Sequence, residues 1–83
     1  MKKSWLVYDR KDKYDHFCCC VRPLFEHDNI ASIVCNIPGI VTANVVLTKK
    51  LAYAWANNTN DIHRKNKRYM WDFMDDGKTP APF

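Results

Sequence analysis

Alternating apolar and polar positions dominate the first third of the chain and predict two strands. Residues 3–9 are rich in β-branched and aromatic side chains, which favour a strand. The charged residues 10–13 suit a hairpin connection, and residues 14–25 predict the second strand. Its alternation separates two faces: Asp15, Phe17, Cys19 and Val21 on one, and Tyr14, His16, Cys18 and Cys20 on the other. The first face is the more apolar from residue 17 onward, so we expect it to pack in the core.

The middle of the chain admits two interpretations. In the first, Asp28 caps a short helix over 29–36, Pro38-Gly39 makes a turn, and residues 40–48 form a β-branched strand. The inward positions of that helix are Ile30, Ile33, Val34 and Ile37. In the second, 31–37 and 41–47 pair as a hairpin across the same turn. We favour the helix slightly.

A longer amphipathic helix is predicted over 49–65, with Thr48 as its N-cap. Leu51, Trp55, Asn58 and Ile62 recur at helical spacing, with Ala54 beside them, and this stripe is expected to face the core. The central Asn-rich segment 57–61 has low helix propensity and weakens the prediction.

Residues 68–74 predict a last strand with Tyr69, Trp71 and Phe73 on one face. The expected fold class is therefore α+β: a small antiparallel sheet of about four strands, one main amphipathic helix packed on one face, and a second, short helix. Residues 1–76 are expected to form one compact domain, and the proline-containing residues 77–83 a flexible C-terminal tail.

Charge adds a basic character to this small domain. The 83 residues carry 13 Lys and Arg against 9 Asp and Glu, a formal charge of +4. Residues 1–68 hold twelve of the basic and six of the acidic residues, so the excess lies in the body and not in the tail. Such a body favours polyanions or an acidic protein surface as partners. A core this small also makes a homodimer an inexpensive way to bury more surface.

The basic cluster near the end of the long helix is the main candidate site. Arg64 and Lys65 complement the negative end of the helix dipole, which is worth about 0.3–1 kcal/mol each. Lys67 and Arg68 need another explanation, as do Lys49 and Lys50, which oppose the dipole at the other end. Together with Tyr69 and Trp71 as stacking rings, these six cations predict a nucleic-acid or partner-binding face.

Other chemistries have little support in the sequence. His16, Cys18 and Cys20 share a strand face, but the chain has no CxxC and no second ligand pair, so no metal site or cofactor is predicted. With two glycines there is no Gly-rich phosphate loop, and no catalytic motif is present, so we expect a protein that is not an enzyme. The apolar run at 5–8 is too short for a secretory signal, and no run has the length of a membrane span, so we expect a cytoplasmic protein with free thiols and no membrane contact.

In general character the chain resembles the small proteins that tailed bacteriophages encode against host functions. The resemblance rests on size, dense aromatics, the basic cluster and the Asn-rich segment "WANNTNDIHRKNKRYMW" at 55–71. It implies an inhibitor of a host or defence system, acting in the host cytoplasm on nucleic acid, on a host protein complex, or on both. The alternative is a protein-only inhibitor or adaptor that binds an acidic surface without nucleic acid.

Overall fold

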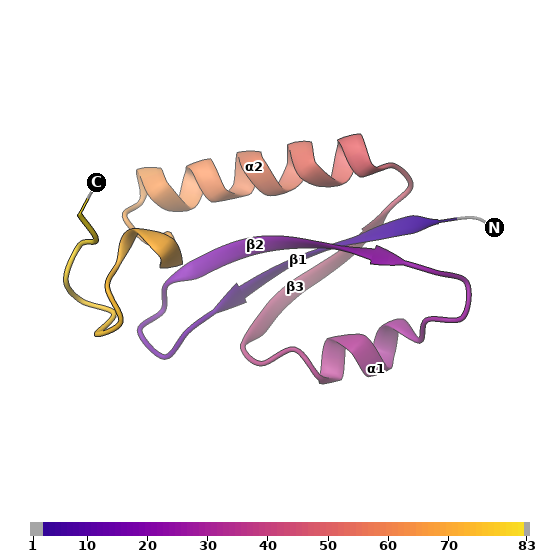
Figure 1. Ribbon diagram of the computed structural model, residues 1–83, viewed down its shortest axis with the longest axis horizontal. Helices are drawn as coiled ribbons and strands as arrows, with labels where there is room; N and C mark the ends of the chain where they lie inside the picture. Colours follow the sequence, from indigo (N-terminus) through magenta and orange to yellow (C-terminus); the bar gives the residue numbers. More distant parts are fainter. Residues whose placement is uncertain (1–2, 83) are drawn as a thin grey trace.

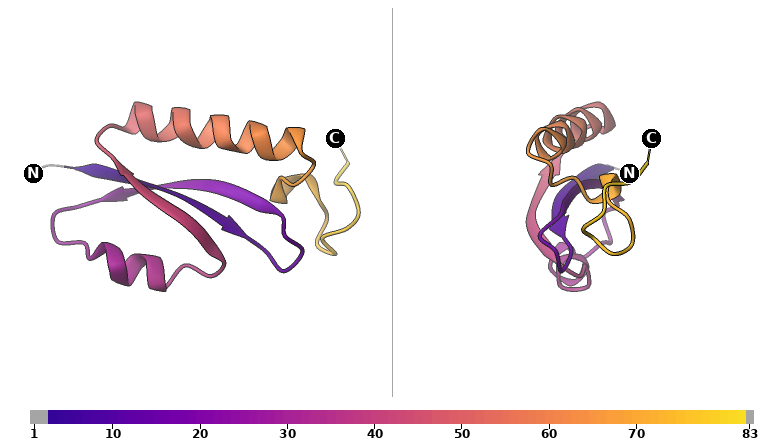
Figure 2. Two further views of the ribbon diagram at one scale, coloured as in Figure 1. Left: turned by 180° about the vertical axis from the view of Figure 1, so that it is seen from behind. Right: turned by 90° about the vertical axis from the view of Figure 1, so that its left-hand side faces the viewer.

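The computed structural model describes residues 3–82 as three strands and two helices with a short 3-10 turn. The elements are β1 (Ser4–Lys11), β2 (Phe17–Leu24), α1 (Ile30–Cys35), β3 (Ile40–Val46), α2 (Lys49–Lys65) and η1 (Met70–Asp72). In Figures 1 and 2, α2 and α1 lie on opposite sides of the three strands. The α+β class is confirmed.

The three strands form one antiparallel sheet in the order β2-β1-β3. Asp9 pairs with Cys19 on one side and with Thr42 on the other. Because β2 and β3 both flank β1, the chain must cross from one edge of the sheet to the other, and α1 lies in that crossover. The helix interpretation of residues 29–36 is therefore confirmed, and the alternative hairpin is wrong.

The cap of α1 differs from the prediction by one residue. Asn29 is the N-cap, and its side-chain oxygen accepts from the Ser32 N–H at 3.2 Å. The Asp28 carboxylate instead accepts from the Phe25 N–H at 2.8 Å and closes the turn after β2. None of the α1 residues is buried, so this helix contributes little to the core.

α2 begins and ends as predicted but packs through another face. Thr48 caps it by accepting from the Leu51 N–H at 3.2 Å. The core beneath it consists of Ala52 and Ala56 against Val7 and Cys19. The alanines let the helix backbone approach the sheet closely.

The predicted inward stripe of α2 is wrong. Leu51, Trp55 and Ile62 are 58%, 44% and 50% exposed, and Ala54 and Asn58 are exposed as well. We call Leu51, Trp55 and Ile62 the apolar stripe. The physical reason is that the opposite face of the helix carries Asn60 and His63, which pair with the Cys19 backbone and with Asp9 of the sheet.

Asn60 is the first of these polar partners. Its side-chain oxygen accepts from the Cys19 N–H at 2.6 Å, and its amide nitrogen donates to the Cys19 carbonyl at 3.0 Å. The side chain thereby occupies the outer edge of β2, a position that another strand would otherwise take.

The fourth strand, predicted over 68–74, is absent. The Phe17 N–H donates to the Arg68 carbonyl at 2.6 Å, and one bridge joins Phe17 to Tyr69. Since Asn60 occupies the β2 edge at Cys19, pairing stops there and the chain turns into η1.

The chain folds back on itself after η1. The Met74 N–H donates to the Thr79 carbonyl at 2.8 Å, and the Ala81 N–H donates to the Asp72 carbonyl at 2.7 Å. The flexibility of the tail stays a prediction, and residues 1, 2 and 83, which belong to the predicted domain and tail, lie outside the described residues.

Candidate nucleic-acid interface at the C-terminal end of α2

The end of α2 fixes the direction of two of the predicted cations. The Lys67 N–H donates to the Arg64 carbonyl at 3.0 Å, and the Arg68 N–H donates to the His63 carbonyl at 2.7 Å. These two bonds are the Schellman pattern of a helix terminus, in which glycine usually holds the left-handed position. Here Lys67 holds it, with φ 57°. The backbone therefore tolerates a strained lysine where glycine would fit without strain.

His63 faces inward and does not belong to the cation cluster. Its Nε2 lies 3.1 Å from both carboxylate oxygens of Asp9, and its ring stacks on Phe17 with centroids 5.1 Å apart. Both partners of the His63–Asp9 pair are largely buried. This pair is the second polar contact that selects the packed face of α2.

Arg64 and Tyr69 form a cation–π pair within the protein. The Arg64 guanidinium lies 4.1 Å from the Tyr69 ring centroid, and it pairs with Asp61 at 3.6 Å and Asp72 at 3.9 Å. Tyr69 is only 7% exposed, and burial raises its pKa. The predicted role of Tyr69 as a stacking ring is therefore wrong, and part of the Arg64 charge is already compensated.

Trp71 is the exposed ring of the predicted pair, at 60%. It lies in η1 and not on a strand, so it shares no strand face with Tyr69. Its indole N–H donates to the Cys18 sulfur at 3.1 Å. One edge of the indole is thus anchored while much of the ring remains open to solvent.

The sulfur that anchors Trp71 is unusually acidic. The pKa of Cys18 is lowered from 9.0 to about 6. The main cause is the side-chain contact with Cys20, whose sulfur lies 3.7 Å away, and the Trp71 hydrogen bond lowers the pKa further. Burial, with a smaller contribution from the charge of Asp9, raises the pKa of Cys19, on the other face of β2, to about 11. All four cysteines are free thiols, and within residues 3–82 no three His, Cys, Asp or Glu side chains gather as metal ligands.

Two grooves meet at Lys67. One, of about 480 Å³, is lined by Lys11, Tyr14, Asp15, His16, Phe17, Lys67 and Arg68. The other, of about 410 Å³, is lined by Lys67, Trp71, Asp72, Phe73, Pro80, Ala81 and Pro82. Lys67 therefore joins a charged groove to one that contains the exposed indole. We call Lys11, Lys67 and Arg68 the basic end.

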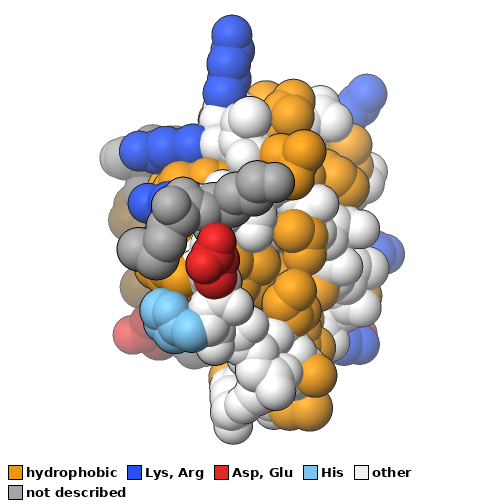
Figure 3. All heavy atoms as spheres, turned by 90° about the vertical axis from the view of Figure 1, so that its right-hand side faces the viewer, with side chains coloured by type: hydrophobic (Ala, Val, Ile, Leu, Met, Phe, Trp, Pro, Cys, Tyr) orange, Lys and Arg blue, Asp and Glu red, His pale blue; other side chains and the backbone are white. Residues whose placement is uncertain are grey.

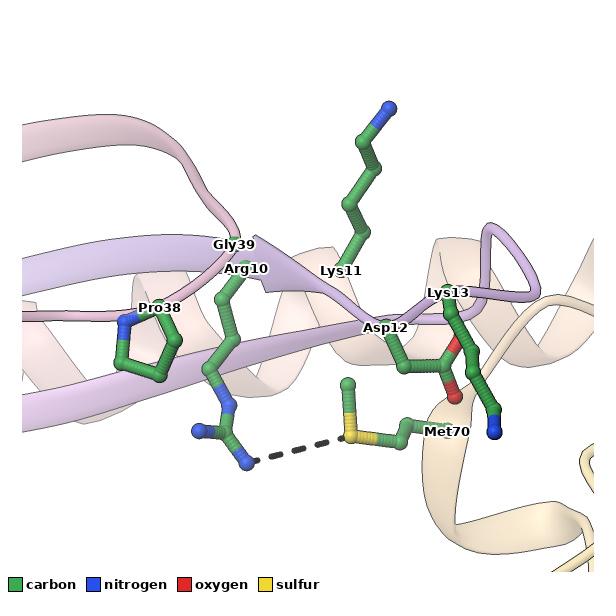
Figure 4. A pocket seen from close by; sticks show the side chains of 7 residues that line it. All are labelled: Arg10, Lys11, Asp12, Lys13, Pro38, Gly39 and Met70. Atoms are coloured by element: carbon green, nitrogen blue, oxygen red, sulfur yellow. Dashed lines mark hydrogen bonds between the residues drawn. The ribbon is translucent and has the colours of Figure 1, made fainter.

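A third groove, of about 490 Å³, continues this surface along the β1–β2 hairpin (Figure 4). Arg10 and Lys13 point to the same side in this view, and Lys11 points to the opposite side. Arg10 donates to the Met70 sulfur at 3.9 Å. Sequence reasoning assigned residues 10–13 to a hairpin connection and missed these cations.

Lys49 and Lys50 do not join the basic end. They begin α2, whose 17 residues separate them from Lys65 by roughly 25 Å. The Lys49 ammonium lies 5.9 Å from the Trp5 ring centroid and 5.8 Å from that of Tyr53. These cation–π contacts give Lys49 a structural role, and the eight predicted site residues do not form one surface. Lys65, at the last turn of α2, is exposed.

Comparison with family models, with curated proteins and with solved structures gives no match. The site must therefore be judged on its geometry alone. Within residues 3–82, no helix is long and apolar enough to cross a membrane.

Proposed function

We propose that this protein is a non-catalytic binding protein that holds a single-stranded nucleic acid, RNA or DNA, at the C-terminal end of α2. Lys11, Lys67 and Arg68 contact successive phosphates, and Trp71 stacks on a base. The observation that carries the proposal is the position of Lys67, which lines both the charged groove and the groove of the exposed indole.

The charges of this surface support a polyanion as ligand. Within residues 3–82, neither Lys67 nor Arg68 has an acidic side chain in ion-pair distance, whereas Arg64 has two. Lys11 pairs with Asp15 at 3.4 Å, but both side chains are exposed and a phosphate can replace that contact at little cost. Three phosphate contacts give a slope of about −2 for the logarithm of affinity against that of salt concentration.

Fluorescence anisotropy with labelled single-stranded RNA and DNA at two salt concentrations tests the proposal. We expect Lys67→Glu to weaken binding strongly and Lys50→Glu, the same charge change at the other end of α2, to leave it nearly unchanged. Trp71→Ala should cost about 1–3 kcal/mol of binding free energy, since it removes one stacking platform.

Two results would overturn the proposal: no binding at low salt, or equal loss in Lys50→Glu and Lys67→Glu. In either case the alternative of a protein-only inhibitor or adaptor gains weight, because exposed Trp and Arg also make protein interfaces. Inhibition of a host or defence system, and a place in the host cytoplasm, stay predictions that rest on the general resemblance.

A further inference from the structure

The outer edge of β3 has little of the protection that a sheet edge usually carries, apart from a register shift near the start of the strand, between the pairs Asp9–Thr42 and Arg10–Ile40. The strand Ile40–Val46 contains no charged residue, no proline and no glycine, and natural edge strands generally carry at least one such protection. The opposite edge of the sheet, on β2, is occupied by Asn60 and by the bridge to Tyr69. Figure 2 shows the C-terminal segment on the side of the sheet away from β3.

The apolar stripe lies on the same side of the molecule as this edge. On the helical wheel, Ala52 and Ala56 point at the sheet and Asn60 points to β2, so Leu51, Trp55 and Ile62 point away from β2, toward β3. Val41, Val45 and Leu47, in and just after β3, are exposed as well. Figure 3 views the end of the molecule that is on the right in Figure 1, and it shows hydrophobic side chains at several heights between the top and the bottom of that end.

The chain exposes more surface than is usual for its mass. The accessible surface is 6082 Å². A folded monomer of 9.8 kDa exposes about 5,200 Å². The excess of roughly 900 Å² is close to the ~800 Å² that each partner buries in a standard interface.

We propose that a second copy of this chain covers this side, by antiparallel pairing of β3 with β3 of the partner. A two-fold axis perpendicular to the sheet joins the two strands, and the sheet becomes six-stranded. The same rotation keeps both α2 helices on one face, so the two apolar stripes face each other over the joined strands. A single symmetric contact thus covers the free edge and the stripe together. Because β3 carries no charge, pairing it with itself brings no like charges together.

Sedimentation velocity on nucleic-acid-free protein over about 1 to 100 µM tests the dimer. A reducing agent is required, because the exposed Cys35 could otherwise cross-link two chains. We expect a species of twice the 9.8 kDa chain mass. Hydrogen exchange should show the outward amides of residues 40–46 protected at high concentration and exposed at low concentration.

Two substitutions at exposed positions should weaken the dimer about tenfold or more. Val45→Lys places like charges at the joined edge, and Trp55→Glu places them in the stripe. Asn57→Glu, on an exposed α2 position outside the stripe, is the matched control and should leave dimerisation unchanged. Circular dichroism establishes that each variant folds.

A 9.8 kDa species at all concentrations overturns the inference, and so does a dimer that survives both substitutions. The inference is independent of the proposed nucleic-acid binding, because its residues lie outside the basic end.

Discussion

Replacing Asn60 by alanine should destabilise the fold far more than the same change at Asn58. Asn60 makes two hydrogen bonds to the Cys19 backbone, at 2.6 and 3.0 Å. Each hydrogen bond contributes about 0.5–1.5 kcal/mol net to the free energy of unfolding. Alanine has a higher helix propensity than asparagine, which offsets about 0.5 kcal/mol of the loss. The expected loss is therefore about 1.5 kcal/mol in the free energy of unfolding.

Urea and thermal unfolding followed by circular dichroism measure this loss. For a domain of this size it corresponds to a fall of roughly 6–12 °C in Tm. Asn58→Ala changes the same residue type two positions away on the exposed side of α2, so it should be neutral or slightly stabilising. If the two variants unfold within about 0.5 kcal/mol of each other, the Asn60 contact does not hold the helix to the sheet edge.

Two further predictions concern the end of α2. Lys67→Gly relieves the left-handed lysine and should raise the unfolding free energy by up to about 1 kcal/mol in urea melts; a less stable variant would show that the lysine is not strained. Trp71→Phe removes the indole donor and should raise the pKa of Cys18 above 6, seen as a later rise of thiolate ultraviolet absorbance with pH. Because the folded-state pKa of Cys18 lies below the ordinary 9.0, the folded protein releases this proton first, and the unfolding free energy rises as pH increases from about 6 to 9. Trp71→Phe should flatten that rise, and an unchanged profile would mean that the indole does not stabilise the thiolate.

Local signals along the chain were sufficient for most elements. Thr48 and the apolar spacing after it defined α2 from its first to its last residue. Runs of β-branched and aromatic residues located β1 and β3, and alternation of the two faces located β2. The packed face of α2 could not be predicted, because its spacing of Leu51, Trp55 and Ile62 also suits a helix that turns those side chains outward. The choice depends on Asp9 and on the Cys19 backbone, which are distant in sequence.

The candidate site could be predicted only in part, again because contacts between residues distant in sequence decide its geometry. Lys67, Arg68 and Trp71 were identified from their local pattern, but whether Trp71 is exposed depends on its contact with Cys18, 53 residues away. Lys11 was missed because only the β1–β2 pairing brings the hairpin next to the end of α2. Lys49 and Lys50 were grouped with the cluster by residue type, and the length of α2 separates them.

The left-handed backbone at Lys67 makes it possible to separate selection for stability from selection for binding at this position. Glycine or asparagine would satisfy the helix terminus better, so a library of variants at this position, selected only for folding, should become enriched in those two residues. A library selected for ligand binding should keep lysine or arginine. If both selections return glycine, the side chain at position 67 does not contribute to ligand binding.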